Sequence, residues 1–277
     1  MIEGTYVLAV ASSIAYGAAD FCGGLATKRS ALLSVVIFSQ LAGGILLAIA
    51  LPLLPPSSPT AIDFAWGAAA GFAGGVGVAW LYRALSKGVM SVIAPVTAVC
   101  AVVVPLIVGM TLGERPTLTA MSGVLLAIVA IILVSQSGET AASTGVPLAI
   151  ASGIAIGIFL VFLARSGPSA GQWPLIAARI VSVSFFAIVG LLRREKLMPS
   201  RQSLPLVIGG GALDMLANIL YVIAVRGGML SIVATLTSLY PTSTIILARI
   251  VLHERLQALQ QIGVVCAAIA IVLIVGS

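Results

Sequence analysis

Residues 8–17 read LAVASSIAYG and residues 148–157 read LAIASGIAIG, so one stretch of sequence returns 140 positions further along the chain. A second correspondence lies near the end of each half, where Glu114-Arg115 matches Glu254-Arg255 at the same spacing. Similarity at one fixed spacing is the sign of a duplicated structural unit. The sequence therefore predicts two related units, which we assign to residues 1–137 and 138–277.

The composition indicates that these units lie in lipid. Of 277 residues, 60% are apolar and only 8% are charged, whereas charged residues form about a quarter of an ordinary globular domain. This excludes a soluble enzyme, a disordered chain and a disulfide scaffold. The net charge of +6 does not indicate nucleic acid as a partner, because the cations occur in ones and twos beside apolar runs. The three cysteines have no metal-ligand spacing, so we expect no metal and no other cofactor.

Ten apolar runs are long enough to cross a bilayer. A spanning helix needs ~20 mostly apolar residues. Short breaks of charged or turn-forming residues separate the runs, and the runs do not alternate polar with apolar residues as membrane strands do. We therefore expect an all-α, multi-pass membrane protein whose partner is the lipid bilayer. The predicted spans are residues 5–26, 32–54, 62–86, 91–111, 118–136, 146–165, 173–192, 204–226, 230–251 and 258–276.

The number of spans in each half predicts how the two units are related. Each half holds five spans, which is an odd number, so the second unit enters the membrane from the side opposite to the first. The predicted fold is therefore two inverted five-helix repeats, related by a pseudo-two-fold axis in the membrane plane. Carriers use this geometry because exchanging the conformations of the two halves converts an outward-open state into an inward-open one.

Several short motifs carry a resemblance to a known family. They are the Gly113-Glu114-Arg115 turn before the fifth span, its His253-Glu254-Arg255 counterpart before the tenth, and Tyr82-Arg83-Ala84-Leu85 at the end of the third. With its two five-span halves, the chain resembles the ten-helix, EamA-type carriers of the drug/metabolite transporter superfamily. Members of that family export or exchange small metabolites, including amino acids. The resemblance implies a central cavity between the halves, lined mainly by the first, third, fourth, sixth, eighth and ninth spans.

Polar side chains inside the spans are the candidates for substrate binding, because polar groups in lipid usually face the bundle interior or a water-filled cavity. Several share one helix face through spacings of three or four residues. Prolines within the fourth and ninth spans predict kinks of the kind found at a carrier's central site. The candidates are Ser12, Tyr16 and Asp20 in the first span, Tyr82 in the third, Thr97 in the fourth, Asp214, Asn218 and Tyr221 in the eighth, and Thr237 and Tyr240 in the ninth.

The two acids of this set, Asp20 and Asp214, leave two interpretations open. Either carboxylate can bind the ammonium group of a substrate or a coupling proton. Alternatively, the acids pair with Arg179, Arg226 or backbone groups and only hold helices together.

Two further patterns predict helix contacts. Gly67, Gly71 and Gly75 recur every four residues in the third span, and such a face of small residues lets another helix approach closely, either as static packing or as a sliding surface. We expect the Glu114-Arg115 and Glu254-Arg255 pairs to cap or anchor helix ends rather than to bind substrate.

The orientation in the membrane stays open. The odd-numbered loops hold ten cations and the even-numbered loops three, so the positive-inside rule places both termini outside. The resemblance implies the reverse, with both termini in the cytoplasm.

The leading hypothesis is a secondary carrier of small organic metabolites, an amino-acid exporter of the inner cell membrane that works by alternating access. The alternative is proton-coupled export of drugs or other metabolites. No Gly-Lys-Ser/Thr motif is present, so the chain itself does not hydrolyse ATP. We do not expect an intramembrane enzyme, since neither Asp20 nor Asp214 lies in an aspartyl-protease context and the only histidine, His253, lies at a loop. A passive channel would show a selectivity filter, and the sequence has none.

Overall fold

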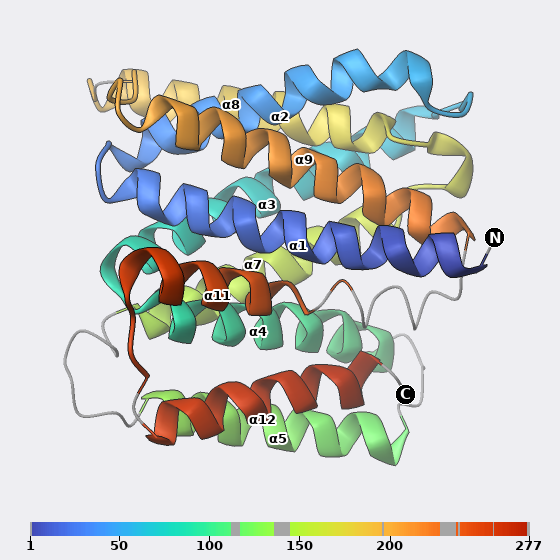
Figure 1. Cartoon of the computed structure of the whole chain (residues 1–277). Coiled ribbons are helices and arrows are strands. Elements are labelled where there is room, and N and C mark those ends of the chain that lie inside the picture. Colours follow the sequence, from blue (N-terminus) through green and yellow to red (C-terminus); the bar gives the residue numbers. More distant parts are fainter. Residues whose placement is uncertain are drawn as a thin grey trace.

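The computed structural model describes residues 2–111, 117–135, 145–195, 197–227, 237, 239–256 and 258–275, and within these ranges it is helical with no strand (Figure 1). The expectation of an all-α fold is confirmed for this part of the chain. The helices are α1 (Ile2–Thr27), α2 (Leu32–Ala50), α3 (Ala61–Lys87), α4 (Met90–Thr111), α5 (Leu118–Ser135), α7 (Val146–Ala164), α8 (Trp173–Leu192), α9 (Leu204–Gly227), α11 (Tyr240–Leu252) and α12 (Ala258–Val275), with 3-10 turns η1 (Leu51–Leu53) and η2 (Pro168–Ala170).

The lengths of these helices confirm a multi-pass membrane protein. Among the described residues, six helices are long and apolar enough to cross a membrane: α1, α2, α3, α7, α8 and α9. Shorter apolar stretches lie in α4, α5, α11 and α12. Each of the ten predicted runs overlaps one of these helices, and the count of ten spans stays a prediction. The first part of the ninth run, the Gly113-Glu114-Arg115 turn and the side chain of Arg226 lie outside the described residues.

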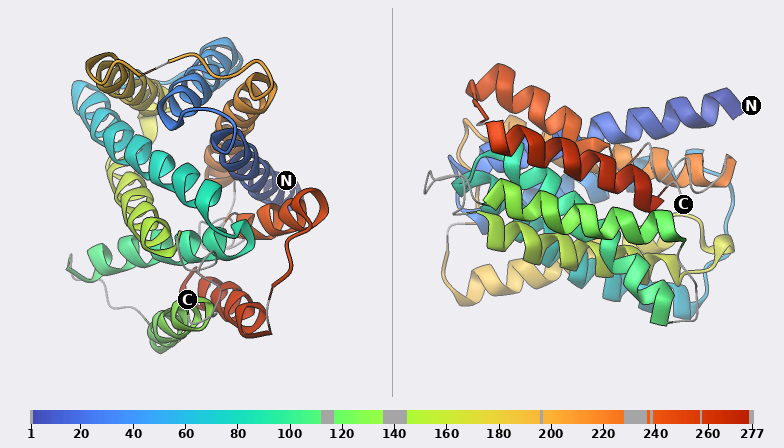
Figure 2. Two further views of the ribbon diagram at one scale, coloured as in Figure 1. Left: turned by 90° about the vertical axis from the view of Figure 1, so that its left-hand side faces the viewer. Right: turned by 90° about the horizontal axis from the view of Figure 1, so that it is seen from below.

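The helices lie side by side in one bundle with a separate pair at its edge (Figures 1 and 2). Helix α1 packs against α9 and α11, while α3 packs against α7 and α8. Helix α2 fills the space between α8 and α9, and α4 packs on α7. At the edge of the bundle, α5 and α12 pack on each other and meet the rest of the bundle through α4. Helices from the two halves of the chain are therefore interleaved rather than separated into two lobes.

Hydrogen bonds between connections identify the two ends of the bundle. At one end the α2–α3 connection meets the α7–α8 connection, because the Ser58 backbone N–H donates to the Ser169 carbonyl at 2.9 Å. At the other end the α1–α2 connection meets the α8–α9 connection, where the Ser200 backbone N–H donates to the Ser30 hydroxyl at 2.9 Å. Helix α1 runs toward the Ser30 end and α7 runs toward the Ser169 end. These two helices therefore run in opposite directions.

Glu254 caps the start of helix α4. Its carboxylate accepts hydrogen bonds from the backbone N–H groups of Met90 at 2.9 Å and Ser91 at 3.0 Å, and from the Ser91 hydroxyl at 2.9 Å. The first N–H groups of a helix have no partner within it and carry partial positive charge, so a carboxylate there stabilises the helix. The expected capping role is confirmed for Glu254. His253 directly before it has a φ of 53° and ends α11 in the left-handed conformation.

The glycine face of α3 is a close helix contact, as the sequence predicts. A Cβ atom built on Gly67 would lie 2.4 Å from the Pro174 carbonyl oxygen of α8. One built on Gly71 would lie 2.2 Å from the carbonyl oxygen of Ala178. In the other half of the chain, a Cβ atom on Gly211 of α9 would lie 2.0 Å from the Ser39 carbonyl oxygen of α2. Backbone meets backbone at each contact, and any side chain would push the helices apart.

We predict that Gly71→Ala destabilises the protein, because the added methyl group has no space between α3 and α8. Overpacking of this kind lowers the free energy of unfolding by about 1–3 kcal/mol. The matched control is Gly209→Ala in α9, where an added Cβ would meet nothing within 4 Å. That substitution should leave stability unchanged or raise it by up to about 1 kcal/mol, since alanine is the better helix former. Unfolding of the purified variants in mixed micelles measures the free energy of unfolding of each. An equal change in the two variants would contradict the close contact at Gly71.

We also predict that Glu254→Ala destabilises helix α4, because two backbone N–H groups and the Ser91 hydroxyl lose their acceptor. The expected loss is about 1–3 kcal/mol. Glu254→Gln should recover part of it, since the amide oxygen still accepts. Glu195→Ala on the exposed α8–α9 connection is the control and should have no effect. Thermal unfolding in detergent reports the difference, and a Glu254→Ala variant as stable as the control would rule out the cap.

Candidate functional site

The predicted residues of α1 lie on the face that meets α9, α11 and α3. Ser12 is fully buried, and its hydroxyl donates to the Ala217 carbonyl of α9 at 2.8 Å. One turn later, the ring of Tyr16 lies 6.3 Å from the ring of Tyr240, with the two planes at 60°. Asp20 follows by one more turn and is half-buried. The polar stripe predicted from the spacing in the first span is therefore directed toward neighbouring helices.

Asp20 lies between two close contacts of α1. Three residues before it, a Cβ atom on Gly17 would lie 2.3 Å from the Tyr240 carbonyl oxygen of α11. Three residues after it, a Cβ atom on Gly23 would lie 2.1 Å from the Tyr82 ring of α3. Residues three apart share a helix face, so Asp20 lies on the face where α3 and α11 meet α1. Asp20 also interacts electrostatically with Asp214.

Asp214 is held in an ion pair that joins three helices. Its Oδ2 accepts a hydrogen bond from Arg179 Nη2 of α8 at 2.5 Å. Arg179 Nη1 donates to Oε1 of Gln40, a buried residue of α2. Asp214 and Arg179 are only 22% and 14% exposed at their side chains, so the pair is largely shielded from solvent. Of the two interpretations for the acids, this geometry favours helix pairing for Asp214.

The other predicted residues of α9 lie on the same helix face as Asp214. Asn218 is buried and donates from Nδ2 to the Asp214 backbone carbonyl at 2.8 Å. Tyr221 is half-buried and packs beside Ala9 and Ala224. Together with the α1 stripe, these residues form one polar seam between α1 and α9.

The two predicted threonines differ in their bonding. Thr97 of α4 is buried, and its hydroxyl donates to the Ala149 carbonyl of α7 at 3.3 Å. Thr237 is also buried, but its hydroxyl oxygen has no hydrogen-bond partner among the described residues.

Two polar residues that the sequence interpretation did not single out also belong to this region. Ser152 is fully buried in α7, and its hydroxyl donates to the Gly77 carbonyl of α3 at 2.7 Å. Ser152 occupies the position in the second copy of the repeat that Ser12 occupies in the first, and this equivalence is the signal that identifies it. Gln40, the partner of Arg179, is an amide within an otherwise apolar run, and that isolation marks it in the sequence.

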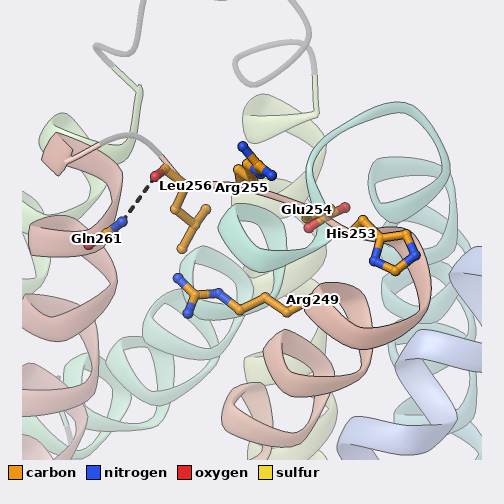
Figure 3. Close-up of a pocket in the computed structure, with 6 residues that line it drawn as sticks. All are labelled: Arg249, His253, Glu254, Arg255, Leu256 and Gln261. Atoms are coloured by element: carbon orange, nitrogen blue, oxygen red, sulfur yellow. Dashed lines mark hydrogen bonds between the residues drawn. The ribbon is translucent and has the colours of Figure 1, made fainter.

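Two hollows open at the ends of the bundle. One, of about 460 Å³, lies beside the α11–α12 connection and is lined by Arg249, His253, Glu254, Arg255, Leu256 and Gln261 (Figure 3). The other, of about 620 Å³, lies at the opposite end, between the segment that follows α2 and residues 171–173. Neither hollow is lined by a predicted substrate residue, so the central cavity stays a prediction. Within the described ranges, no group of three His, Cys, Asp or Glu residues could hold a metal ion.

Comparison with known proteins identifies the family. The model of the EamA-like transporter family matches residues 4–136 and again residues 143–276. A solved crystal structure of a protein with 12% sequence identity superposes with a TM-score of 0.62 over 99% of this chain and 98% of its own, which shows a common fold. No curated protein matches the sequence significantly. The two family matches together cover nearly the whole chain, and both halves carry the same pattern. The chain belongs to the EamA-like transporter family, and it is a membrane transporter of the drug/metabolite superfamily.

Proposed function

We propose that the protein is a secondary carrier that exports amino acids or similar small metabolites by alternating access between two inverted repeats, residues 1–137 and 138–277. The observation that carries the proposal is a pair of equivalent hydrogen bonds between the halves. The hydroxyl of Ser12 donates to the Ala217 carbonyl, and that of Ser152 donates to the Gly77 carbonyl. The two donors, Ser12 and Ser152, lie 140 positions apart in the sequence. The two acceptors, Gly77 and Ala217, also lie 140 positions apart, so each bond is the repeat counterpart of the other.

Helix packing supports the same exchange. Helices α1, α2 and α3 of the first half correspond to α7, α8 and α9 of the second. The α1–α9 contact then corresponds to α7–α3, the α2–α9 contact to α8–α3, and the α1–α11 contact to α7–α4, and all six contacts are present. Helices α1 and α7 run in opposite directions, which supports an inverted arrangement. Because the halves pack by equivalent contacts, their two conformations can be exchanged at little cost in free energy, as alternating access requires.

Fine contacts agree with the helix pattern. A Cβ atom on Gly17 would lie 3.0 Å from the Thr244 backbone nitrogen, and one on Gly157 would lie 2.5 Å from the Val104 Cβ. Both residue pairs are related by the spacing of 140. Helix α1 therefore crosses α11 much as α7 crosses α4. These equivalent crossings support a shared substrate site bordered by the first and sixth predicted spans.

The substrate site that we propose lies between these helices. It comprises the half-buried residues Tyr16, Asp20, Tyr221 and Tyr240, with Tyr82 and Thr237 behind them. The hydroxyls of Ser12 and Thr97 are donated to neighbouring backbone, so these residues support the site through helix packing. Aromatic rings with a few polar groups are what a small organic metabolite requires from its pocket. We place the protein in the inner cell membrane. Proton-coupled export of drugs is the alternative function, since Asp20 could carry a proton.

We predict saturable counterflow of at least one amino acid in proteoliposomes that hold the purified protein, tested across the twenty standard amino acids. Counterflow requires that one site faces each side in turn, so an excess of unlabelled substrate inside should accelerate uptake of labelled substrate several-fold. Liposomes without protein and liposomes with heat-denatured protein are the controls. Flux that rises linearly with concentration would identify a channel instead. Equal flux with and without protein across the whole panel would refute the carrier.

A further inference from the structure

The two acids of the seam are bonded differently. Asp214 is neutralised by Arg179, which Gln40 holds in place. Asp20 makes no hydrogen bond and no ion pair with any residue that the structure describes. The same residue type therefore has a structural partner on α9 and none on α1. A carboxylate inside a membrane bundle without a partner is a costly arrangement, and proteins retain it where it has a function.

The charges around Asp20 do not balance. Among the described residues of the seam, Asp20 and Asp214 contribute two negative charges and Arg179 contributes one positive charge. Asp214 lies on α9, which packs against α1, and its negative charge adds repulsion at Asp20. Helix α9 is close at this level, because a Cβ atom on Gly210 would lie 3.0 Å from the Cys22 Cβ and 3.4 Å from the Ala19 carbonyl oxygen. The described residues of the seam therefore carry one more negative charge than positive charge.

Tyrosines of α1, α3 and α11 lie within about one turn of Asp20 along α1. The Tyr82 ring lies against Gly23, one turn after Asp20, and the backbone carbonyl of Tyr240 lies against Gly17, one turn before it. Tyr16 lies four residues before Asp20 and its ring is beside that of Tyr240. The faces of aromatic rings attract organic ammonium groups, whereas a proton bound to the carboxyl group gains nothing from them.

We propose that Asp20 binds the protonated amine of the transported substrate within a cage formed by Tyr16, Tyr82 and Tyr240. This inference rests on the proposed function and names the substrate class, which is small metabolites that carry an ammonium group. The carboxylate supplies the charge that the amine needs, and the rings replace the water that the ammonium group leaves. Asp214 takes no part in recognition, because Arg179 occupies it.

The test separates the ammonium group from the rest of a ligand. Hexylamine and hexanol have the same chain, and only hexylamine is charged at neutral pH. Binding of each to the purified protein is measured by thermal stabilisation over a concentration series. The native protein should bind hexylamine at least about tenfold more tightly than hexanol, the usual effect of a hydrogen bond to a charged group. In Asp20→Asn this preference should fall below about twofold, while hexanol binding is unchanged.

Three further variants make the result specific. Glu195→Gln makes the same chemical change on the exposed α8–α9 connection and should keep the full preference for hexylamine. Asp214→Asn should melt at a lower temperature, because Arg179 loses its partner, yet keep the preference. Tyr16→Leu should weaken it about threefold, since one ring is lost and the charge remains. Asp20→Asn itself should melt no lower than the native protein, because it relieves repulsion with Asp214.

Each contrary result has a defined meaning. An unchanged preference in Asp20→Asn, or no preference in the native protein, would overturn the inference. The same holds if Asp20→Asn abolishes the pH dependence of counterflow but keeps the preference for hexylamine, because Asp20 would then carry a proton. If Asp20→Asn does not fold, the Tyr16→Leu result decides. Amino-acid counterflow in the native protein reports on the proposed function separately, so a carrier without the amine preference refutes this inference alone.

Discussion

No water is available in the middle of a bilayer, so each polar group carried there by a helix must find its partner within the chain. The bundle satisfies this requirement with hydrogen bonds from side chains to the backbone of a neighbouring helix. Ser12, Ser152 and Thr244 are all fully buried, and each donates its hydroxyl to a carbonyl of a helix far away in the sequence. These bonds fix which helices pack together and the position of each helix along the axis of its neighbour. Against that background the carboxylate of Asp20 and the hydroxyl of Thr237 are exceptional, because neither has a hydrogen-bond partner among the described residues.

Close packing between helices supplies the stabilising free energy that the hydrophobic effect does not provide inside a bilayer. Lipid tails are as apolar as leucine, so helices in a membrane gain little by hiding apolar side chains from them. They associate instead through contact between backbones, which only small residues allow. Gly71 against Ala178 and Gly211 against Ser39 are contacts of this kind, and each joins a helix of the first half to a helix of the second. The larger apolar side chains, including Ile45, Leu125 and Val265, remain exposed on the outer surface, as contact with lipid requires.

Much of the architecture can be predicted from the sequence. The apolar runs and their charged or turn-forming breaks locate the helices, since length and hydropathy alone decide what can span a bilayer. Small residues every four positions on α3 predict a close neighbour, although the pattern does not identify α8 as that neighbour. The capping role of Glu254 follows from its position at a loop beside an apolar run.

The bonding of the site is harder to predict. Spacing along one helix shows which side chains share a face, but it does not show which helix that face meets. Asp20 and Asp214 are therefore equivalent in sequence terms, and only the folded bundle places Arg179 and Gln40 beside one of them. Ser12 and Thr97 have the same ambiguity, because a backbone carbonyl of another helix leaves no trace in the sequence. Symmetry is the one signal that could have identified Ser152, since it occupies the position of Ser12 in the other copy.

The pairing of α5 with α12 has a consequence for how the molecule is made. The main neighbour of α5 lies at residues 258–275, so residues 136–257 are synthesised between the two partners. During that interval α5 stays in the membrane with α4 as its companion and with one side covered only by lipid. The edge layer of the bundle can close only after α12 has been inserted. Biogenesis therefore passes through an open, partly assembled stage, which is the point at which a membrane chaperone would find its binding surface.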